Sequence, residues 1–385
     1  MSRSVRGGSV LGILDAKIRN AIGEDLFAGA VLRVERGHGG GAGLLFEAAW
    51  GEALRTASAK VPMAVDTIFD IASITKIFTA TAVLRLATTG RIGLDARLGS
   101  IPGLFDAGKD PKLHSALSAA IGSKNLSSLL SHSSGIHYWY PFYARRGESF
   151  EAILAEILAA HPPREETVYS DLNFMLLGRV IEALTGKSVD VAVGELVLAP
   201  LGLSRSSWRA PRGAVAATEF GNRIEEGMVA ELGLSFDGWR DRERPITGEP
   251  DDGNCHYFFG DAAGHAGLFS DARDLCRLGR LYLDGGRVDG EAFLDPRIVA
   301  EASRDHGAGR GLGFQLGDNY PGGGFGHTGF TGSYLHVNAK SGLVIVLLAN
   351  RLHVEAPRDL NPFRREISEI ALSLFGQAEG SGRAS

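Results

Sequence analysis

A serine and a lysine stand three positions apart in the segment "IFDIASITKIFTATAVLRLATTGRIGLD", residues 68–95. The apolar pattern predicts a strand that turns into a helix, so Ser73 and Lys76 would share one helical face. At the helix N-terminus, the dipole and free N–H groups could support a nucleophilic serine, provided that the amine has a lowered pKa and takes the serine proton. Serine is also a favoured helix cap, and lysine is a good helix former. The pair alone therefore fits nucleophilic catalysis and simple capping equally well.

Two further polar groups stand directly before predicted regular elements. One lies in "ETVYSDLNFMLLGRVIEALTG", before an apolar helix, and the other lies in "GGGFGHTGFTGSYLHVN", before a strand. The residues concerned are Tyr169, Ser170 and Asp171 in the first group, and His327, Thr328 and Gly329 in the second.

With these three groups in this order, the sequence resembles the superfamily of serine β-lactamases, penicillin-binding proteins and related esterases. The resemblance is to its class C-like branch, which includes family VIII carboxylesterases and D-aminopeptidases. The segment 73–76 matches the Ser-x-x-Lys motif, 169–171 the Tyr-x-Asn motif and 327–329 the Lys-Thr-Gly motif. The flanking segments "LLSHSSGI", "AGHAGLFSDARDL" and "LLANR" extend the resemblance over nearly the whole chain.

The resemblance implies a covalent acyl-enzyme mechanism. It assigns Ser73 as the acylated nucleophile, Lys76 as its general-base partner and Tyr169 as a proton relay to the leaving group. The backbone N–H groups of Ser73 and Phe330 would form the oxyanion hole, which stabilises charge that develops in the transition state. Lysine and tyrosine have ordinary pKa values near ~10, so the site must lower them before either acts as a base at neutral pH. Which of the two accepts the first proton stays open.

The third motif carries His327 where family members that act on β-lactams or D-Ala-D-Ala peptides have a lysine that helps to hold a substrate carboxylate. An ordinary histidine pKa of ~6.5 leaves the imidazole mostly uncharged at pH 7.5. A charged hydrogen bond contributes roughly 1.5–3 kcal/mol against ~1 kcal/mol for a neutral one, so carboxylate-bearing substrates could lose about tenfold in binding. We therefore expect esters or small amides to be preferred over β-lactams, although a protonated histidine could still bind a carboxylate.

The second motif carries Asp171 where the family has asparagine. An ionised carboxylate cannot donate a hydrogen bond, and close to Lys76 it would favour the ammonium form. Three interpretations follow: Tyr169 takes more of the base role, Asp171 contacts a substrate amine, or Asp171 caps the following helix.

Several other residues are candidates for weaker roles. Asn350 and Arg351, at the end of the last predicted strand, could meet the far end of the substrate, although an arginine there could equally have a structural partner. The aromatic segment "HYWYPFYARR", residues 137–146, either lines an acyl pocket or packs against helices.

A histidine-rich stretch after residue 255 raises the question of a metal. His256, Asp261 and His265 lack the spacing of the known zinc motifs, and this chemistry needs no metal. We expect no metal and no other cofactor, and we expect His265 to be hydrogen-bonded in a tight loop.

The elements that position these residues predict an α/β (α+β) fold. Helical spacing predicts a helix at residues 9–24, and two strand-like runs around "HGGGAG" predict an antiparallel hairpin. A second hairpin, "SYLHVN" and "GLVIVLLAN", precedes a C-terminal amphipathic helix. We expect a β-lactamase/transpeptidase-like architecture in which an antiparallel sheet flanked by helices receives a mostly helical lobe, with a cleft between them. The expected ranges are 1–78 and 256–385 for the sheet lobe, 79–205 for the helical lobe and 206–255 for an irregular surface excursion.

Composition and charge argue against two classes of partner, nucleic acids and membranes. The 385 residues are 44% apolar and carry a net charge of -5, which argues against nucleic acid. No segment approaches the ~18 apolar residues of a membrane span, and the apolar run near the N-terminus is too short for a signal peptide, so we expect a cytoplasmic protein without a membrane partner. The sequence of a mature periplasmic or secreted protein would look the same, so that alternative stays open. Cys255 and Cys276 are expected to be buried, reduced thiols.

The leading hypothesis is a serine hydrolase, carboxylesterase-like, acting on a small-molecule ester or amide. The first alternative is a class C-like β-lactamase or D-Ala-D-Ala peptidase. The second is a penicillin-binding or sensor protein that is acylated without turnover. Transfer of the acyl group to an alcohol other than water also stays open.

Overall fold

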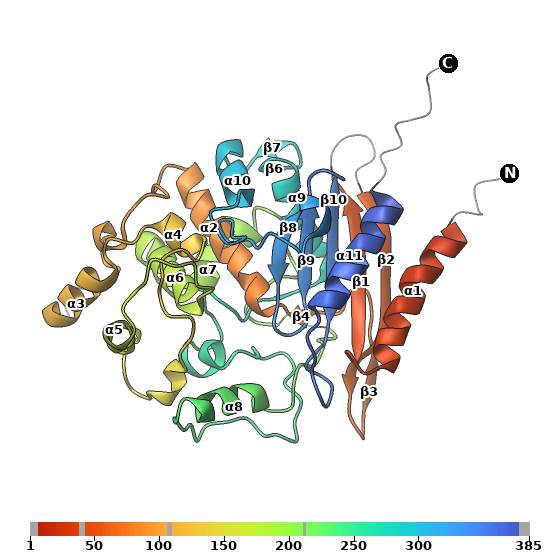
Figure 1. Cartoon of the computed structure of the whole chain (residues 1–385), viewed down its shortest axis with the longest axis horizontal. Coiled ribbons are helices and arrows are strands. Elements are labelled where there is room, and N and C mark those ends of the chain that lie inside the picture. The colour runs from red at the N-terminus through yellow and green to blue at the C-terminus, as the bar shows by residue number, and fades with distance from the viewer. Residues whose placement is uncertain (1–6, 38–42, 106–109, 211–212, 377–385) are drawn as a thin grey trace, which may run out of the picture.

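A six-stranded antiparallel sheet joins the two ends of the chain (Figure 1). The computed structural model describes residues 7–37, 43–105, 110–210 and 213–376. The sheet strands are β1 (Gly29–Arg36), β2 (Gly43–Arg55), β3 (Lys60–Pro62), β8 (Phe325–Thr328), β9 (Tyr334–Asn338) and β10 (Leu343–Ala349). Their order is β3-β2-β1-β10-β9-β8, so the N-terminal and C-terminal hairpins meet where β1 pairs with β10. Both predicted hairpins are confirmed, while most of the "HGGGAG" turn lies outside the described residues.

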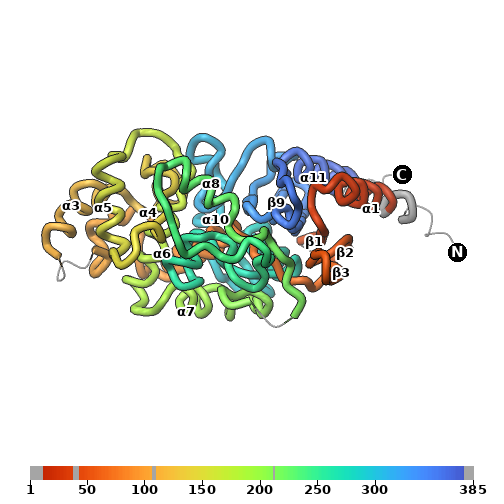
Figure 2. Tube along the Cα trace, turned by 90° about the horizontal axis from the view of Figure 1, so that it is seen from below, coloured from red at the N-terminus to blue at the C-terminus, as the bar shows by residue number. Residues whose placement is uncertain are grey.

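The central strands are buried on both faces, and successive side chains enter two different cores. In β10, Val344 and Val346 enter one core while Leu343 and Ile345 enter the other. A near-continuous apolar run of this kind is typical of a strand covered on both sides. The covering helices are α1 (Gly7–Gly23) and α11 (Asn361–Phe375) on one face, which lie side by side in Figure 2, and α9 (Ala272–Leu283) on the other.

The helical lobe packs around one buried helix. Its helices are α2 (Thr75–Thr88), α3 (Pro111–Ile121), α4 (Leu126–Leu130), α5 (Phe150–Ala160), α6 (Asp171–Thr185) and α7 (Val189–Val193). Eleven of the fourteen residues of α2 are buried, as in a helix that is apolar or small on all sides. In Figure 1, α2 lies between the sheet and the outer helices, so its N-terminus is placed where the two lobes meet.

In its described residues, the segment 206–255 has more regular structure than its composition predicts. It contains α8 (Arg223–Glu231), which lies along the lower edge of the molecule in Figure 1. An aromatic cluster anchors it, with the Tyr143 ring 4.9 Å from that of Phe236 and 5.5 Å from that of Trp239. The expectation of a mere surface excursion is therefore corrected, because aromatic partners far apart in sequence give the segment a small core of its own.

Short elements complete the fold. They are β4 (Phe69–Asp70), which pairs with β5 (Phe269–Ser270), the hairpin of β6 (Arg287–Val288) and β7 (Glu291–Ala292), and α10 (Pro296–Ser303). Both cysteines are buried and unbonded, as predicted. Within the described ranges, no helix combines the length and the apolar character needed to cross a membrane.

Candidate active site

Ser73 lies in a short turn of 3-10 helix that directly precedes α2. The preceding residue, Ala72, has a φ of 47°, in the left-handed region that non-glycine residues seldom adopt. The Asp70 carboxylate stabilises this turn by accepting a hydrogen bond of 2.8 Å from the Ala72 N–H. Helix α2 is capped at Ile74, without a side-chain hydrogen bond. The capping interpretation of Ser73 is therefore wrong, and its hydroxyl is available for another role.

Lys76 is fully buried beneath Ser73. Its Nζ lies 3.0 Å from Ser73 Oγ, 2.9 Å from the His265 carbonyl oxygen and 2.7 Å from Asp171 Oδ1. Burial alone would lower the pKa of Lys76, but the electrostatic attraction of Asp171 and Tyr169 outweighs burial and raises that pKa above its ordinary value. Lys76 is therefore an ammonium at neutral pH.

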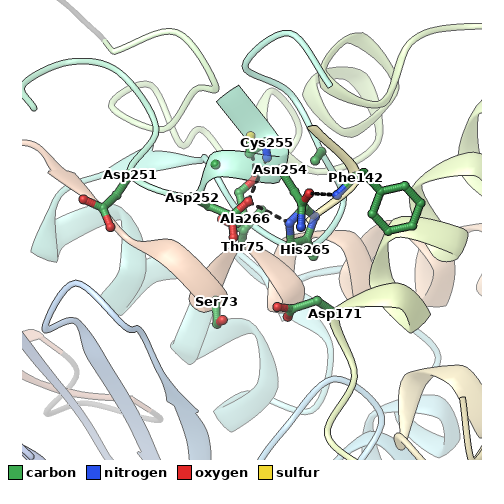
Figure 3. Close-up of polar contacts among 12 residues, drawn as sticks. Ser73, Thr75, Phe142, Asp171, Asp251, Asp252, Asn254, Cys255, His265 and Ala266 are labelled. Carbon is green, nitrogen blue, oxygen red and sulfur yellow. Dashed lines mark hydrogen bonds and ion pairs between the residues drawn. The ribbon is translucent and has the colours of Figure 1, made fainter. Parts of the chain in front are cut away.

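Asp171 reaches Lys76 from the first turn of α6. The cap of this helix is Ser170, whose hydroxyl accepts from the Asn173 N–H, so the interpretation of Asp171 as the cap is wrong. Its contact with Lys76 is an ion pair by distance, without the angle of a directed hydrogen bond. Figure 3 shows the Asp171 carboxylate near Ser73, and its side chain is 19% exposed. Of the roles considered for Asp171 from the sequence, the structure thus supports stabilisation of the ammonium form of Lys76.

Tyr169 joins the first and third motifs. Its ring centroid lies 5.2 Å from Lys76 Nζ and 6.0 Å from the ring of His327. The Arg310 guanidinium lies 4.9 Å from the same ring. All three motifs therefore meet at one place, although they are separated by about a hundred residues or more in the chain.

A pocket of about 590 Å³ opens over Ser73. Its walls come from the turn before α2, the start of α6, the turn after β8, α8 and the segment that leads into α11. Of the residues that the sequence singled out, it is lined by Ser73, Tyr169, Asp171, Thr328, Gly329, Phe330 and Arg351. The aromatic segment 137–146 serves both suggested purposes, because Tyr138 and Trp139 line the pocket while Phe142 is packed in the core.

His327 is present in the third motif but offers no charge to the pocket. It is 1% exposed, and its Nδ1 donates to the Thr328 carbonyl oxygen at 2.7 Å. Burial, reinforced by the charges of Lys76 and Arg310, holds the pKa of His327 well below its ordinary value. The imidazole is therefore neutral at physiological pH, which removes the alternative of a protonated histidine as a carboxylate anchor.

The structure separates Asn350 from Arg351. Asn350 is 2% exposed and does not line the pocket, because its amide accepts from the Gly29 N–H at 2.7 Å and donates to the Glu52 carbonyl oxygen at 3.0 Å. The suggestion that it meets the substrate is thereby corrected. Arg351 lines the pocket and also has a structural partner, since its Nε donates to the Phe330 carbonyl oxygen at 3.0 Å.

The turn after β8 is held directly against the turn that carries Ser73. Thr331 Oγ1 donates to the Asp70 carbonyl oxygen, and Ser333 Oγ donates to the Ile71 carbonyl oxygen, both at 2.8 Å. A Cβ atom at Gly329 would lie 2.5 Å from the Ile71 oxygen, so only glycine allows this approach. The Phe330 N–H has no hydrogen-bond partner among the described residues. This N–H group is therefore available to donate a hydrogen bond to an acceptor atom in the pocket.

The β-lactamase family model matches residues 24–369. The chain belongs to the β-lactamase family. This β-lactamase-family serine hydrolase is 28% identical over 372 residues to a putative D-alanyl-D-alanine carboxypeptidase of Escherichia coli K12, with 86% of this chain and 82% of the relative covered.

Two solved structures share the β-lactamase/transpeptidase fold with it. EstCE1, described as a hydrolase with promiscuous acyltransferase activity, has a TM-score of 0.70 at 19% identity and covers 95% of this chain and 99% of its own. A class C β-lactamase from Rhodobacter sphaeroides has a TM-score of 0.68 at 20% identity, with 94% and 98% covered. Identities this low establish the fold alone, and the fold predicted from the motifs is confirmed.

Several polar residues of this β-lactamase-family site were not foreseen from the sequence. They are Glu225, Asp251, Asp252, Gln315, Asn361 and Arg364, all of which line the pocket. None stands in a recognisable motif, and each reaches the pocket only through the folding of α8, α11 or a loop. His265 was expected to be hydrogen-bonded, and its Nε2 does donate to Asp252 Oδ1 at 3.0 Å (Figure 3), but its carbonyl contact with Lys76 had no sequence signal.

The residues considered for a metal do not converge. His256 pairs with Asp261 at 2.6 Å, whereas His265 pairs with Asp252. Within the described ranges, no group of three or more His, Cys, Asp or Glu side chains has the arrangement of a metal site.

Several buried carboxyl groups lie in and next to the pocket wall that Asp251 and Asp252 line. Burial, together with the nearby charge of Asp251, raises the pKa of Asp70 to about 7. Burial and Asp251 likewise raise the pKa of Glu219 to about 8, and burial raises the pKa of Asp251 itself. For Asp252, His265 outweighs burial and keeps the pKa low. Asp70 and Glu219 thus retain protons, at pH values where the unfolded chain would release them, and the raised pKa of Asp251 acts in the same direction.

This arrangement predicts that the folded protein becomes less stable as the pH rises from about 4 to 8, because the unfolded chain then binds fewer protons than the folded one. Asp251→Asn removes one charge of the set and should flatten this slope, raising the melting temperature at pH 8 by at least about 2 °C. Thermal unfolding at pH 5, 6, 7 and 8 measures the effect. Asp237→Asn, at a side chain that is 87% exposed, is the control and should leave the slope unchanged. An equal slope in Asp251→Asn and the parent protein would contradict the prediction.

Proposed function

We propose that this serine hydrolase acts through a covalent acyl-enzyme at Ser73 on esters or small amides, in the manner of a carboxylesterase. The observation that supports the chemistry most directly is the contact of 3.0 Å between Ser73 Oγ and the buried Lys76 ammonium, beside Tyr169. The observation that supports the substrate preference is the neutral, buried His327 in the third motif.

In the proposed mechanism, Tyr169 reacts as the phenolate and accepts the Ser73 proton, because Lys76 already carries its full complement of protons. Ser73 Oγ then attacks the substrate carbonyl carbon, and the developing oxyanion receives hydrogen bonds from the N–H groups of Ser73 and Phe330. Tyr169 returns the proton to the departing alcohol or amine, which leaves an ester of Ser73. Water attacks this ester with Tyr169 again as base, releasing the acid and restoring the serine hydroxyl. Whenever Tyr169 is the phenolate, before each proton transfer to it, the Lys76 ammonium stabilises the negative charge on the tyrosine oxygen.

The pocket walls support uncharged or weakly polar acyl groups. Tyr138 and Phe330 are 48% and 46% exposed and present aromatic surface at the pocket. Asp252 lines another wall, and because His265 keeps the pKa of Asp252 low, its ionised carboxylate would repel an anionic acyl group.

The strongest competing function is a D-Ala-D-Ala carboxypeptidase or β-lactamase. It is favoured by the similarity to the E. coli putative D-alanyl-D-alanine carboxypeptidase and by the presence of Arg351 and Arg364 in the pocket, since either substrate carries a carboxylate. A protein acylated without turnover and an acyltransferase are the remaining alternatives, and both keep Ser73 as nucleophile.

A substrate panel tests the proposal. Steady-state kcat/KM is compared for p-nitrophenyl butyrate, a D-alanine p-nitroanilide, a D-Ala-D-Ala peptide and nitrocefin. We expect the ester to have the highest kcat/KM, and release of free acid shows hydrolysis rather than transfer. Faster turnover of nitrocefin or of the D-Ala-D-Ala peptide would overturn the ordering, and a burst without steady state would indicate a sensor.

The substitution His327→Lys is expected to shift the substrate preference from esters toward β-lactams. A charged side chain at this position should raise kcat/KM for nitrocefin relative to the ester by about tenfold, since a charged hydrogen bond to carboxylate is stronger than a neutral one by roughly 1 kcal/mol or more. His327→Gln is the uncharged control, and thermal unfolding checks that each variant is folded. If the two variants have the same ratio, charge at this position does not govern the preference.

A further inference from the structure

A buried guanidinium from α11 contacts the turn that carries Phe330. Arg364 is 5% exposed, and its Nη2 donates to the carbonyl oxygens of Gly329 at 2.7 Å and of Ser333 at 2.9 Å. Its Nη1 donates to Asn361 Oδ1 at 3.0 Å. No carboxylate lies within ion-pair distance of Arg364 in the described part of the chain. The positive charge of this arginine is therefore directed at backbone carbonyl groups.

The Gly329 carbonyl and the Phe330 N–H belong to the same peptide group. A charged hydrogen bond to the carbonyl oxygen draws electron density through the amide and makes its N–H a stronger donor. This N–H has no partner among the described residues, and both residues line the pocket beside Ser73. Polarisation of the peptide therefore strengthens the Phe330 N–H, the group that would donate a hydrogen bond to the oxyanion.

A second arginine contacts the next carbonyl of the same turn. Arg351 Nε donates to the Phe330 oxygen at 3.0 Å, and its guanidinium lies 4.9 Å from the Phe330 ring. The two contacts hold the carbonyls on either side of the Phe330 Cα, which fixes the plane of the Gly329–Phe330 peptide. Only Arg364 contacts the carbonyl that shares a peptide group with the N–H, so the two arginines differ in their expected effect on donor strength.

We infer that Arg364 is a positioning residue that aligns and polarises the Gly329–Phe330 peptide, so that the Phe330 N–H stabilises the oxyanion. This inference rests on the proposed function. A direct role in holding substrate fits the geometry less well, because two of its nitrogens are bonded within the protein and the third, Nε, has no partner but is shielded from solvent. The guanidinium acts on the reaction through the backbone.

The test compares Arg364→Lys and Arg364→Gln with Arg365→Gln, the matched control. Arg365 is the next residue of the same helix, is exposed and has no polar partner among the described residues. The substrates are a p-nitrophenyl ester and its thionoester, in which sulfur replaces the carbonyl oxygen and accepts N–H hydrogen bonds poorly. Loss of one complete oxyanion donor lowers kcat by about 10²–10³-fold, so weakening one donor should lower kcat for the oxygen ester by roughly tenfold or more.

We expect both Arg364 variants to lower kcat for the oxygen ester at unchanged KM and to reduce the oxygen-to-sulfur rate ratio by a similar factor. Arg365→Gln should change neither quantity. An equal fall for ester and thionoester would overturn the inference in favour of a purely structural role, and a higher KM confined to carboxylate-bearing substrates would overturn it in favour of direct binding. Unchanged kinetics would also overturn it. Arg364→Lys retains a charge and a long side chain, so it serves if the glutamine variant does not fold.

The parent protein separates failure of this inference from failure of the proposed function. Ester turnover that depends on Ser73 establishes the function before any Arg364 variant is measured. If the parent does not turn over esters, the proposed function fails by itself. If it does and the rate ratio is unaffected by Arg364, only the inference fails.

Discussion

Replacing Ser73 with alanine is expected to lower ester kcat/KM by more than about 10³-fold and to abolish labelling by a fluorophosphonate. The substitution removes the only atom that could form the acyl-enzyme in the proposed mechanism. It leaves Lys76 with its contacts to Asp171 and the His265 carbonyl, so the buried ammonium stays paired and the fold should persist. Mass-spectrometric mapping of the labelled peptide in the parent protein identifies the nucleophile directly.

The exposed Ser58 provides the control for this experiment, since Ser58→Ala should retain both activity and label. Label at any residue other than Ser73 in the parent would contradict the mechanism. Label at Ser73 that forms in a single burst, with no steady state for any ester, would keep the nucleophile and reject the hydrolase.

Lys76→Met is the second substitution with a large expected effect, and it should act on activity and stability together. Removing one partner of a buried ion pair costs about 3–5 kcal/mol of folding free energy, because the other charge is left uncompensated. Here the remaining charge is Asp171, whose side chain is 19% exposed, which places the loss toward the lower end. Without the ammonium beside Ser73 and Tyr169, we also expect kcat/KM for the ester to fall by about 10³-fold.

The double variant Lys76→Met/Asp171→Asn separates these two effects. It removes both charges, so chemical denaturation should show most of the lost stability recovered, while ester turnover stays at the level of Lys76→Met. Recovery of activity in the double variant would show that Lys76 serves only to neutralise Asp171. Equal stability in the single and double variants would show that the pair is not coupled.

Asp171→Asn alone distinguishes the two candidate bases. The raised pKa of Lys76 depends on Asp171, so this substitution lowers that pKa and releases the lysine proton at a lower pH. If the ammonium supports Tyr169, activity should begin to fall at a lower pH than in the parent protein. If Lys76 is itself the base, activity at neutral pH should rise instead, and the pH profile of kcat/KM shows which occurs.

Elements with a clear apolar period were predictable because their burial follows from residues close in sequence. The helix at the N-terminus, the C-terminal hairpin and the last helix all formed where the period placed them. The structure of the segment 206–255 was not predictable in this way, because α8 packs against aromatic residues such as Tyr143 that lie far away in the chain. Its charged, irregular composition concealed that it carries one wall of the pocket.

The sequence alone was sufficient to identify the three motifs, their order and the family that carries them, since these depend only on residue types and spacing. It could not establish the charge states and partners at the site. Lys76 is an ammonium because Asp171 lies 2.7 Å away, and His327 is neutral because the core encloses it. Asn350 is turned into the sheet, whereas Arg364 reaches the oxyanion turn from a helix that no motif marks. Hydrogen bonds and pKa values depend on distances between groups far apart in the chain, and only the packed tertiary structure sets those distances.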